Sequence, residues 1–143
     1  MCNSILQVFT PYQSSTNLPK ENQPVEIMSN FDDVPNLSGN VNDIVNFYRQ
    51  KLSSAKHAGD KAREGVVYSI LGRFFLDRCD YKKAKEYNYL ALDIFKELDN
   101  KRQEGYVCQC LGDVFQELCN FEKAIEYQNR AHSIAIDLGE KPL

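Results

Sequence analysis

The sequence predicts an all-α protein in which helical repeats stack side by side. Residues 65–98 and 105–138 are two copies of one unit, offset by forty positions in a chain of 143 residues. A fixed period of this size is typical of stacked-repeat proteins, in which neighbouring units bury one another's apolar faces. The pairs that recur include Gly65 and Gly105, Leu71 and Leu111, Gly72 and Gly112, Phe75 and Phe115, Cys79 and Cys119, Ala84 and Ala124, Tyr87 and Tyr127, and Ala91 and Ala131.

Each copy contains two predicted amphipathic helices, because apolar residues recur at three- and four-residue steps on both sides of a break. Asp80 and Asn120 follow the breaks, where a short side-chain oxygen can accept a hydrogen bond from a free backbone N–H. Asp60 and Asn100 are predicted to cap the first helix of each copy in the same way. The predicted helices are 61–78 and 81–98 in a repeat spanning 61–99, and 101–118 and 121–138 in a repeat spanning 100–143.

Gly72 and Gly112 lie inside the first helix of each copy, where glycine costs about 0.5–1 kcal/mol relative to alanine. Their recurrence predicts a packing role, in which the missing Cβ lets the second helix approach closely. Small residues on the second helix, Ala84 and Ala91 in the first copy, are expected to meet this surface.

The residues before these copies predict a degenerate repeat at 24–60. Its second helix is expected at 41–58, whereas its first helix is reduced to a short segment at about 25–33. Pro35 stands where the register places Phe75, and proline inside a helix costs about 3 kcal/mol or more. Residues 1–23 are rich in polar residues and proline without any period, so we expect disorder there.

Composition and motifs favour a binding protein over an enzyme. The net charge of −3 comes with no basic stripe for a phosphate backbone, and no apolar run approaches the roughly 18–20 residues that span a bilayer. Five cysteines without a secretory signal predict an intracellular, cytoplasmic protein with reduced thiols. We find no phosphate-binding glycine loop, metal-ligand spacing or nucleophile–base pair, and therefore expect no cofactor, metal or catalytic residue.

The two copies resemble tetratricopeptide repeats. The resemblance is carried by Leu111-Gly112-x-x-Phe115, followed by Asn120-Phe121-x-Lys123-Ala124-Ile125-Glu126-Tyr127-x-x-x-Ala131, and covers about residues 41–141. The forty-residue period is similar to the longer variant of Pins-type polarity proteins and of large metazoan scaffold proteins. The resemblance implies a right-handed superhelix whose first helices line a concave peptide-binding groove.

Some positions depart from this family's pattern. Cys79 and Cys119 stand at the turn where family members usually have glycine, and a left-handed backbone there costs a non-glycine residue roughly 1–2 kcal/mol. Arg73 and Asp113 replace the asparagine that usually follows the Leu-Gly pair. The residues that clamp a carboxylate in chaperone-binding members are absent as well.

A helical wheel that turns Leu71 and Phe75 toward the second helix predicts which residues line the groove. The groove would be lined by residues of the first helix in the first copy and by their counterparts forty positions later. The ten candidates are Val66, Ser69, Arg73, Leu76, Asp77, Tyr106, Gln109, Asp113, Gln116 and Glu117. Arg73 would pair with a carboxylate of a bound peptide, Asp113 and Glu117 with basic side chains, and Tyr106 would anchor the interface.

The sequence therefore predicts a scaffold or adaptor that binds a peptide segment of a partner protein. One alternative is self-assembly through terminal helices, since Ile134, Ile136 and Leu138 predict an apolar flank on the last helix with no further helix to cover it. Another is a peptide-sensing regulator, although residues 1–40 contain no helix-turn-helix pattern.

Overall fold

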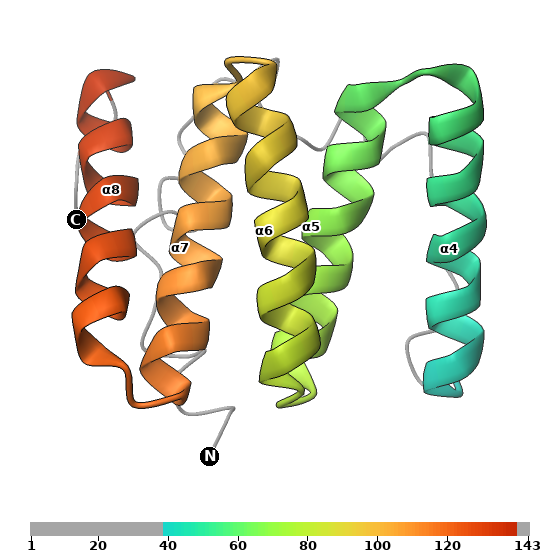
Figure 1. Ribbon diagram of the computed structural model, residues 1–143, viewed down its shortest axis with the longest axis horizontal. Coiled ribbons are helices and arrows are strands. Elements are labelled where there is room, and N and C mark those ends of the chain that lie inside the picture. The colour runs from blue at the N-terminus through green and yellow to red at the C-terminus, as the bar shows by residue number, and fades with distance from the viewer. Residues whose placement is uncertain (1–38, 140–143) are drawn as a thin grey trace.

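The computed structural model describes residues 39–139, which form five α-helices and no strand. Their order along the chain is also their order in space (Figure 1). Consecutive helices pack on each other, and α5 also contacts α7. The helices are α4 (Val41–Ala58), α5 (Lys61–Asp77), α6 (Tyr81–Glu97), α7 (Lys101–Glu117) and α8 (Phe121–Asp137).

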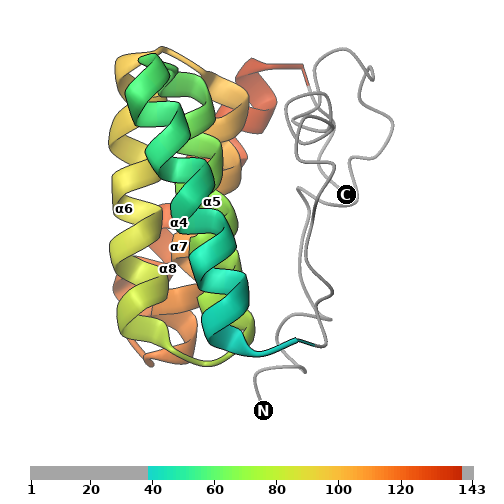
Figure 2. The same cartoon turned by 90° about the vertical axis from the view of Figure 1, so that its right-hand side faces the viewer.

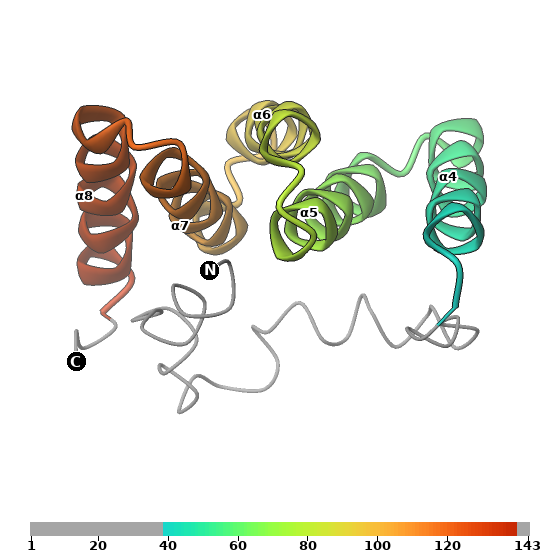
Figure 3. The same cartoon turned by 90° about the horizontal axis from the view of Figure 1, so that it is seen from below.

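The helices form two layers, which confirms the predicted all-α repeat architecture. Seen from the α4 end, their axes run along roughly one direction (Figure 2). Seen end-on, the chain zigzags, with α4, α6 and α8 in one layer and α5 and α7 in the other (Figure 3). The segment predicted to be disordered, 1–23, and the short helix expected at 25–33 lie outside the described residues.

The same short turn follows each helix. Gly59, Cys79, Asp99, Cys119 and Gly139 recur at twenty-residue steps and all have positive φ, from 54° at Asp99 to 77° at Gly139. Helices α5 to α8 each end one residue earlier than predicted, because Arg78, Leu98, Leu118 and Leu138 are their C-caps.

An aspartate or asparagine caps the start of each helix. In α5 to α8 its side chain accepts a hydrogen bond from the backbone N–H three residues on, as when Asp60 accepts from Arg63 at 3.0 Å. Asn40 caps α4 by accepting from the N–H of Asn42 at 2.9 Å. The predicted capping roles of Asp60, Asp80, Asn100 and Asn120 are therefore confirmed.

Each repeat is held by a stacked pair of aromatic rings. Phe75 of α5 stacks on Tyr87 of α6 with ring centroids 5.7 Å apart and planes 6° apart. Phe115 of α7 stacks on Tyr127 of α8 at the same 5.7 Å with planes 4° apart. The two copies therefore share their internal packing as well as their sequence.

The helix glycines permit this close packing, as predicted. A Cβ on Gly72 would lie 2.6 Å from the amide of Asn88, whose Nδ2 donates to the Ala84 carbonyl at 2.8 Å. Asn88 and Ala84 are fully buried, so neither can move aside. At Gly112 the nearest atom would be Cγ of Gln128, at 2.8 Å. That side chain is only half-buried and can rotate away.

We predict that Cys119→Gly stabilises the protein by about 0.5–1 kcal/mol. Cys119 is exposed and has a φ of 59°. Its Cβ is sterically unfavourable in this left-handed conformation, whereas glycine has no Cβ. Urea unfolding followed by circular dichroism measures the change. Cys119→Ala is the matched control, since it removes the thiol and keeps the Cβ. An equal gain in both variants would show that the thiol, and not the backbone, is responsible.

We predict that Gly72→Ala destabilises the protein by about 1–3 kcal/mol, although alanine is the better helix former. The reason is the contact with buried Asn88. Gly112→Ala should cost less, because Gln128 can rotate. Chemical denaturation of both variants tests this order, and a stabilised Gly72→Ala protein would contradict the packing.

Candidate functional site

The ten residues predicted to line a groove lie on α5 and α7, the two helices of one layer (Figure 3). They differ widely in exposure. Val66, Ser69, Leu76, Gln109 and Asp113 are buried, with at most 5% of each exposed. Arg73, Tyr106, Gln116 and Glu117 are half-buried, and Asp77 is exposed.

A charged cluster lies where α5 meets α7, and we call Arg73, Asp77, Tyr106, Cys110 and Asp113 the seam cluster. The Arg73 Nε lies 3.4 Å from an Asp77 oxygen, and its Nη1 lies 4.0 Å from Oδ2 of Asp113. Arg73 and Asp113 are forty residues apart, so equivalent positions of two repeats hold opposite charges that face each other across the seam.

The Asp113 carboxylate is the more deeply buried of the two acids in the cluster. Its side chain is only 1% exposed, and neither oxygen has a hydrogen-bond partner within the described residues. Burial raises the pKa of Asp113 to about 7; Arg73 opposes this rise, and Glu117 adds to it. A buried, unsatisfied carboxylate is costly, which marks this position as a candidate functional group.

Cys110 belongs to the cluster but was not among the predicted site residues. It is fully buried, and this burial raises the pKa of its thiol to about 11. The neighbouring Cys110 and burial in turn raise the pKa of Tyr106. Its four-residue spacing from Tyr106 places both on one helix face, and that signal was available in the sequence.

Gln116 and Glu117 point away from the seam cluster, toward the other layer. Gln116 accepts a hydrogen bond from Gln128 of α8 at 3.3 Å, and Glu117 accepts one from the Tyr81 hydroxyl of α6 at 3.2 Å. Their half-buried side chains therefore tie α7 to its neighbours.

The buried apolar candidates belong to the core instead of a free surface. Val66 packs in the cluster that contains Leu92 and Phe95, and Leu76 packs in the cluster that contains Ile44 and Val114. Ser69 donates its hydroxyl to the Val66 carbonyl at 2.8 Å, within its own helix. The helical wheel placed these residues on a free side because it considered only the contact between α5 and α6.

The cysteines fulfil the sequence prediction only in part. Cys108, Cys110 and Cys119 are free thiols, the first two buried and the third exposed. Cys79, in contrast, is disulfide-bonded, so the prediction of reduced thiols throughout is wrong at this position.

Two further searches covered the described residues. Between residues 39 and 139, no three side chains of the metal-binding types gather at a common point. None of the helices in the same range combines the length and apolar character needed to cross a bilayer.

Comparison with known proteins identifies no relative: no family model and no curated protein matches this sequence. The structure thus establishes the class, an all-α helical repeat protein. The resemblance to tetratricopeptide repeats stays an interpretation of the residues quoted above.

We predict that the stability difference between Asp113→Asn and the parent grows with pH. The pKa of Asp113 is about 7 in the folded chain and about 3.9 when unfolded. Between these values the folded state binds more protons than the unfolded one, so rising pH destabilises the parent. The variant lacks this titration. Between pH 5 and pH 8, its free energy of unfolding should therefore rise by about 1–3 kcal/mol relative to that of the parent.

Urea unfolding at several pH values measures this difference. Asp137→Asn, at an exposed position of α8, is the control and should follow the parent. A difference between Asp113→Asn and the parent that stays constant with pH would show that Asp113 has an ordinary carboxyl pKa.

Proposed function

We propose that this protein is a protein–protein interaction scaffold, without catalytic activity, that binds a segment of a partner along α5 and α7. The supporting observation is the seam cluster, in which a buried, unsatisfied carboxylate lies 4.0 Å from the Arg73 guanidinium. Such a carboxylate lowers the stability of the fold, so stability does not explain its presence. A binding role does explain it, because the carboxylate would fix the position of an arginine that binds the ligand.

Arg73 is the proposed contact residue. Its side chain is 20% exposed, held between exposed Asp77 and buried Asp113. A guanidinium in this position can donate hydrogen bonds to a carboxylate or to backbone carbonyls of an extended segment. Tyr106 lies in the same cluster and adds a rigid aromatic surface. Asp113 acts through Arg73, as a positioning residue.

We also propose that this scaffold is cytoplasmic; three free thiols support that placement, and the disulfide at Cys79 argues against it. Mass spectrometry after alkylation, without reduction, tests that placement. Cys108, Cys110 and Cys119 should be labelled once the chain is unfolded. Labelling of Cys79 as well would agree with the cytoplasm, whereas a Cys79 that stays unlabelled because of its disulfide would contradict this placement.

The binding proposal is tested by selecting peptides from a displayed random library on the full chain and measuring their affinities. We predict that Arg73→Gln weakens the selected peptides at least about tenfold, as expected for a charged hydrogen bond worth roughly 1.5–3 kcal/mol. Asp113→Asn should weaken them less, because the guanidinium loses only its orientation.

Glu97→Gln is the matched control, since it changes one exposed charge on α6, in the other layer. It should leave the affinities unchanged. Circular dichroism establishes that each variant is folded. If selected peptides bind Arg73→Gln and the parent equally, the seam is not the binding site.

Self-assembly through α8 is the second candidate, and the exposure of that helix favours it. Phe121, Ile125 and Ile136 are 59%, 57% and 53% exposed. Forty residues earlier, α6 has Lys85 and Lys96 at the positions of Ile125 and Ile136. Leu138 is exposed as predicted, whereas Ile134 is buried.

We predict that Ile125→Lys with Ile136→Lys, which introduces the α6 residues into α8, abolishes any concentration-dependent association. Multi-angle light scattering of parent and variant over a wide concentration range measures it. A parent that stays monomeric at the highest concentration contradicts self-assembly, and leaves the peptide-binding proposal untouched.

A further inference from the structure

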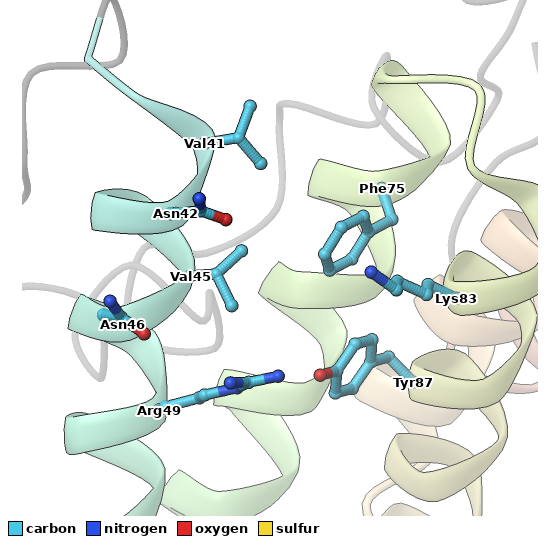
Figure 4. Close-up of a pocket in the computed structure, with 8 residues that line it drawn as sticks. All are labelled: Val41, Asn42, Val45, Asn46, Arg49, Phe75, Lys83 and Tyr87. Carbon is cyan, nitrogen blue, oxygen red and sulfur yellow. The ribbon is translucent and has the colours of Figure 1, made fainter.

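A pocket of about 290 Å³ lies between α4 and α6, away from the seam cluster. Five of its residues come from α4, one from α5 and two from α6 (Figure 4). The lining residues are Val41, Asn42, Val45, Asn46, Arg49, Phe75, Lys83 and Tyr87.

The charged lining residues of this pocket are both cations. Arg49 extends from α4 toward the hydroxyl of Tyr87, and Lys83 extends from α6 beside Phe75 (Figure 4). The lining contains no carboxylate. Lys83 has a distant exposed partner, Asp80, at 3.9 Å. Such loose surface pairs are weak, so the positive charge of Lys83 remains available to an anion.

The stacked rings of Phe75 and Tyr87 form an aromatic wall of the pocket next to these cations. The Lys83 Nζ lies 5.1 Å from the Phe75 ring centre. Val41 and Val45 provide apolar surface on the α4 side. The pocket therefore combines a flat apolar wall with two cations and the amides of Asn42 and Asn46.

The equivalent place in the next repeat is filled. Forty positions on, Val45 corresponds to Lys85 and Arg49 to Tyr89. The Lys85 Nζ lies 6.0 Å from the Phe115 ring centre, and the Tyr89 ring packs on Tyr127 with centroids 6.4 Å apart. All five α4 lining residues differ from their counterparts on α6, and the changes at positions 45 and 49 place larger side chains against the aromatic pair of the following repeat.

We propose that this pocket binds a carboxylate that carries a flat apolar group, such as a free aromatic acid or an aromatic residue at the C-terminus of a peptide. The carboxylate lies between Arg49 and Lys83, and the flat group lies against Phe75 and Tyr87. This site is independent of peptide binding along α5 and α7, since it uses the α4–α6 side of the repeat.

The test is an NMR titration of the ¹⁵N-labelled full chain with phenylacetate and, separately, with N-acetylphenylalanine. At about 290 Å³ the pocket lies just below the roughly 300–1,000 Å³ range of small-molecule sites, so we expect weak binding with a Kd of about 0.1–1 mM. Amide signals of Val45, Arg49 and Lys83 should shift. Shifts with phenylacetate alone indicate a free acid as the ligand, and shifts with N-acetylphenylalanine alone indicate a peptide terminus.

Two variants and one control ligand distinguish this site from general charge attraction. Arg49→Gln with Lys83→Gln should weaken binding at least about tenfold, and Arg49→Tyr should block it by introducing the residue that α6 has at this position. Lys82→Gln, a neighbouring exposed lysine outside the pocket, should bind like the parent. N-acetylphenylalaninamide, which lacks the carboxylate, should bind far more weakly. Equal binding of the amide, full affinity in the double variant, or no shifts with either acid would overturn the proposal.

Discussion

One short turn, repeated every twenty residues, determines how this chain packs. A residue with left-handed backbone closes each helix, and in four of the five turns the next described residue is an aspartate or asparagine that caps the following helix. The N–H of that capping residue also bonds back across the turn, as when Asp80 donates to the Phe75 carbonyl at 2.9 Å. Because each turn reverses the chain within three residues, consecutive helices must pack side by side and antiparallel.

Because this turn recurs regularly, residues forty positions apart occupy equivalent positions in neighbouring repeats. A difference in residue type between two repeats therefore changes the chemistry of the surface at that position. The aromatic pair that joins α5 to α6 recurs between α7 and α8 with nearly the same geometry. Where the repeats differ, local chemistry changes: Arg73 faces Asp113 across the seam, and Arg49 stands where the next repeat has Tyr89. Both proposed sites arise from such departures from the repeat.

Much of the fold could be predicted from the sequence, because period, caps and glycines are local signals. The start of each described helix, the capping residues and the close approach at Gly72 all follow from residue types at fixed spacing. The site was less predictable. α5 packs against α4 and α7 as well as α6. Val66 is buried in the cluster with α6 and α7 residues, and Leu76 in the cluster with α4 and α7 residues, whereas a helical wheel that considers only the α5–α6 contact leaves both exposed. The disulfide at Cys79 and the α4–α6 pocket depend on three-dimensional neighbours that no periodic pattern encodes.

The most direct test of this account is the titration of the Asp113 side-chain carboxyl carbon by ¹³C NMR in the folded chain. The seam between α5 and α7 encloses a carboxylate that lies beside Arg73 and has no hydrogen-bond partner among residues 39–139. We expect a titration midpoint of about 7. A midpoint near the ordinary aspartate value of about 3.9 would show that Asp113 is solvated or well paired. That result would contradict the proposal that the seam is a functional site.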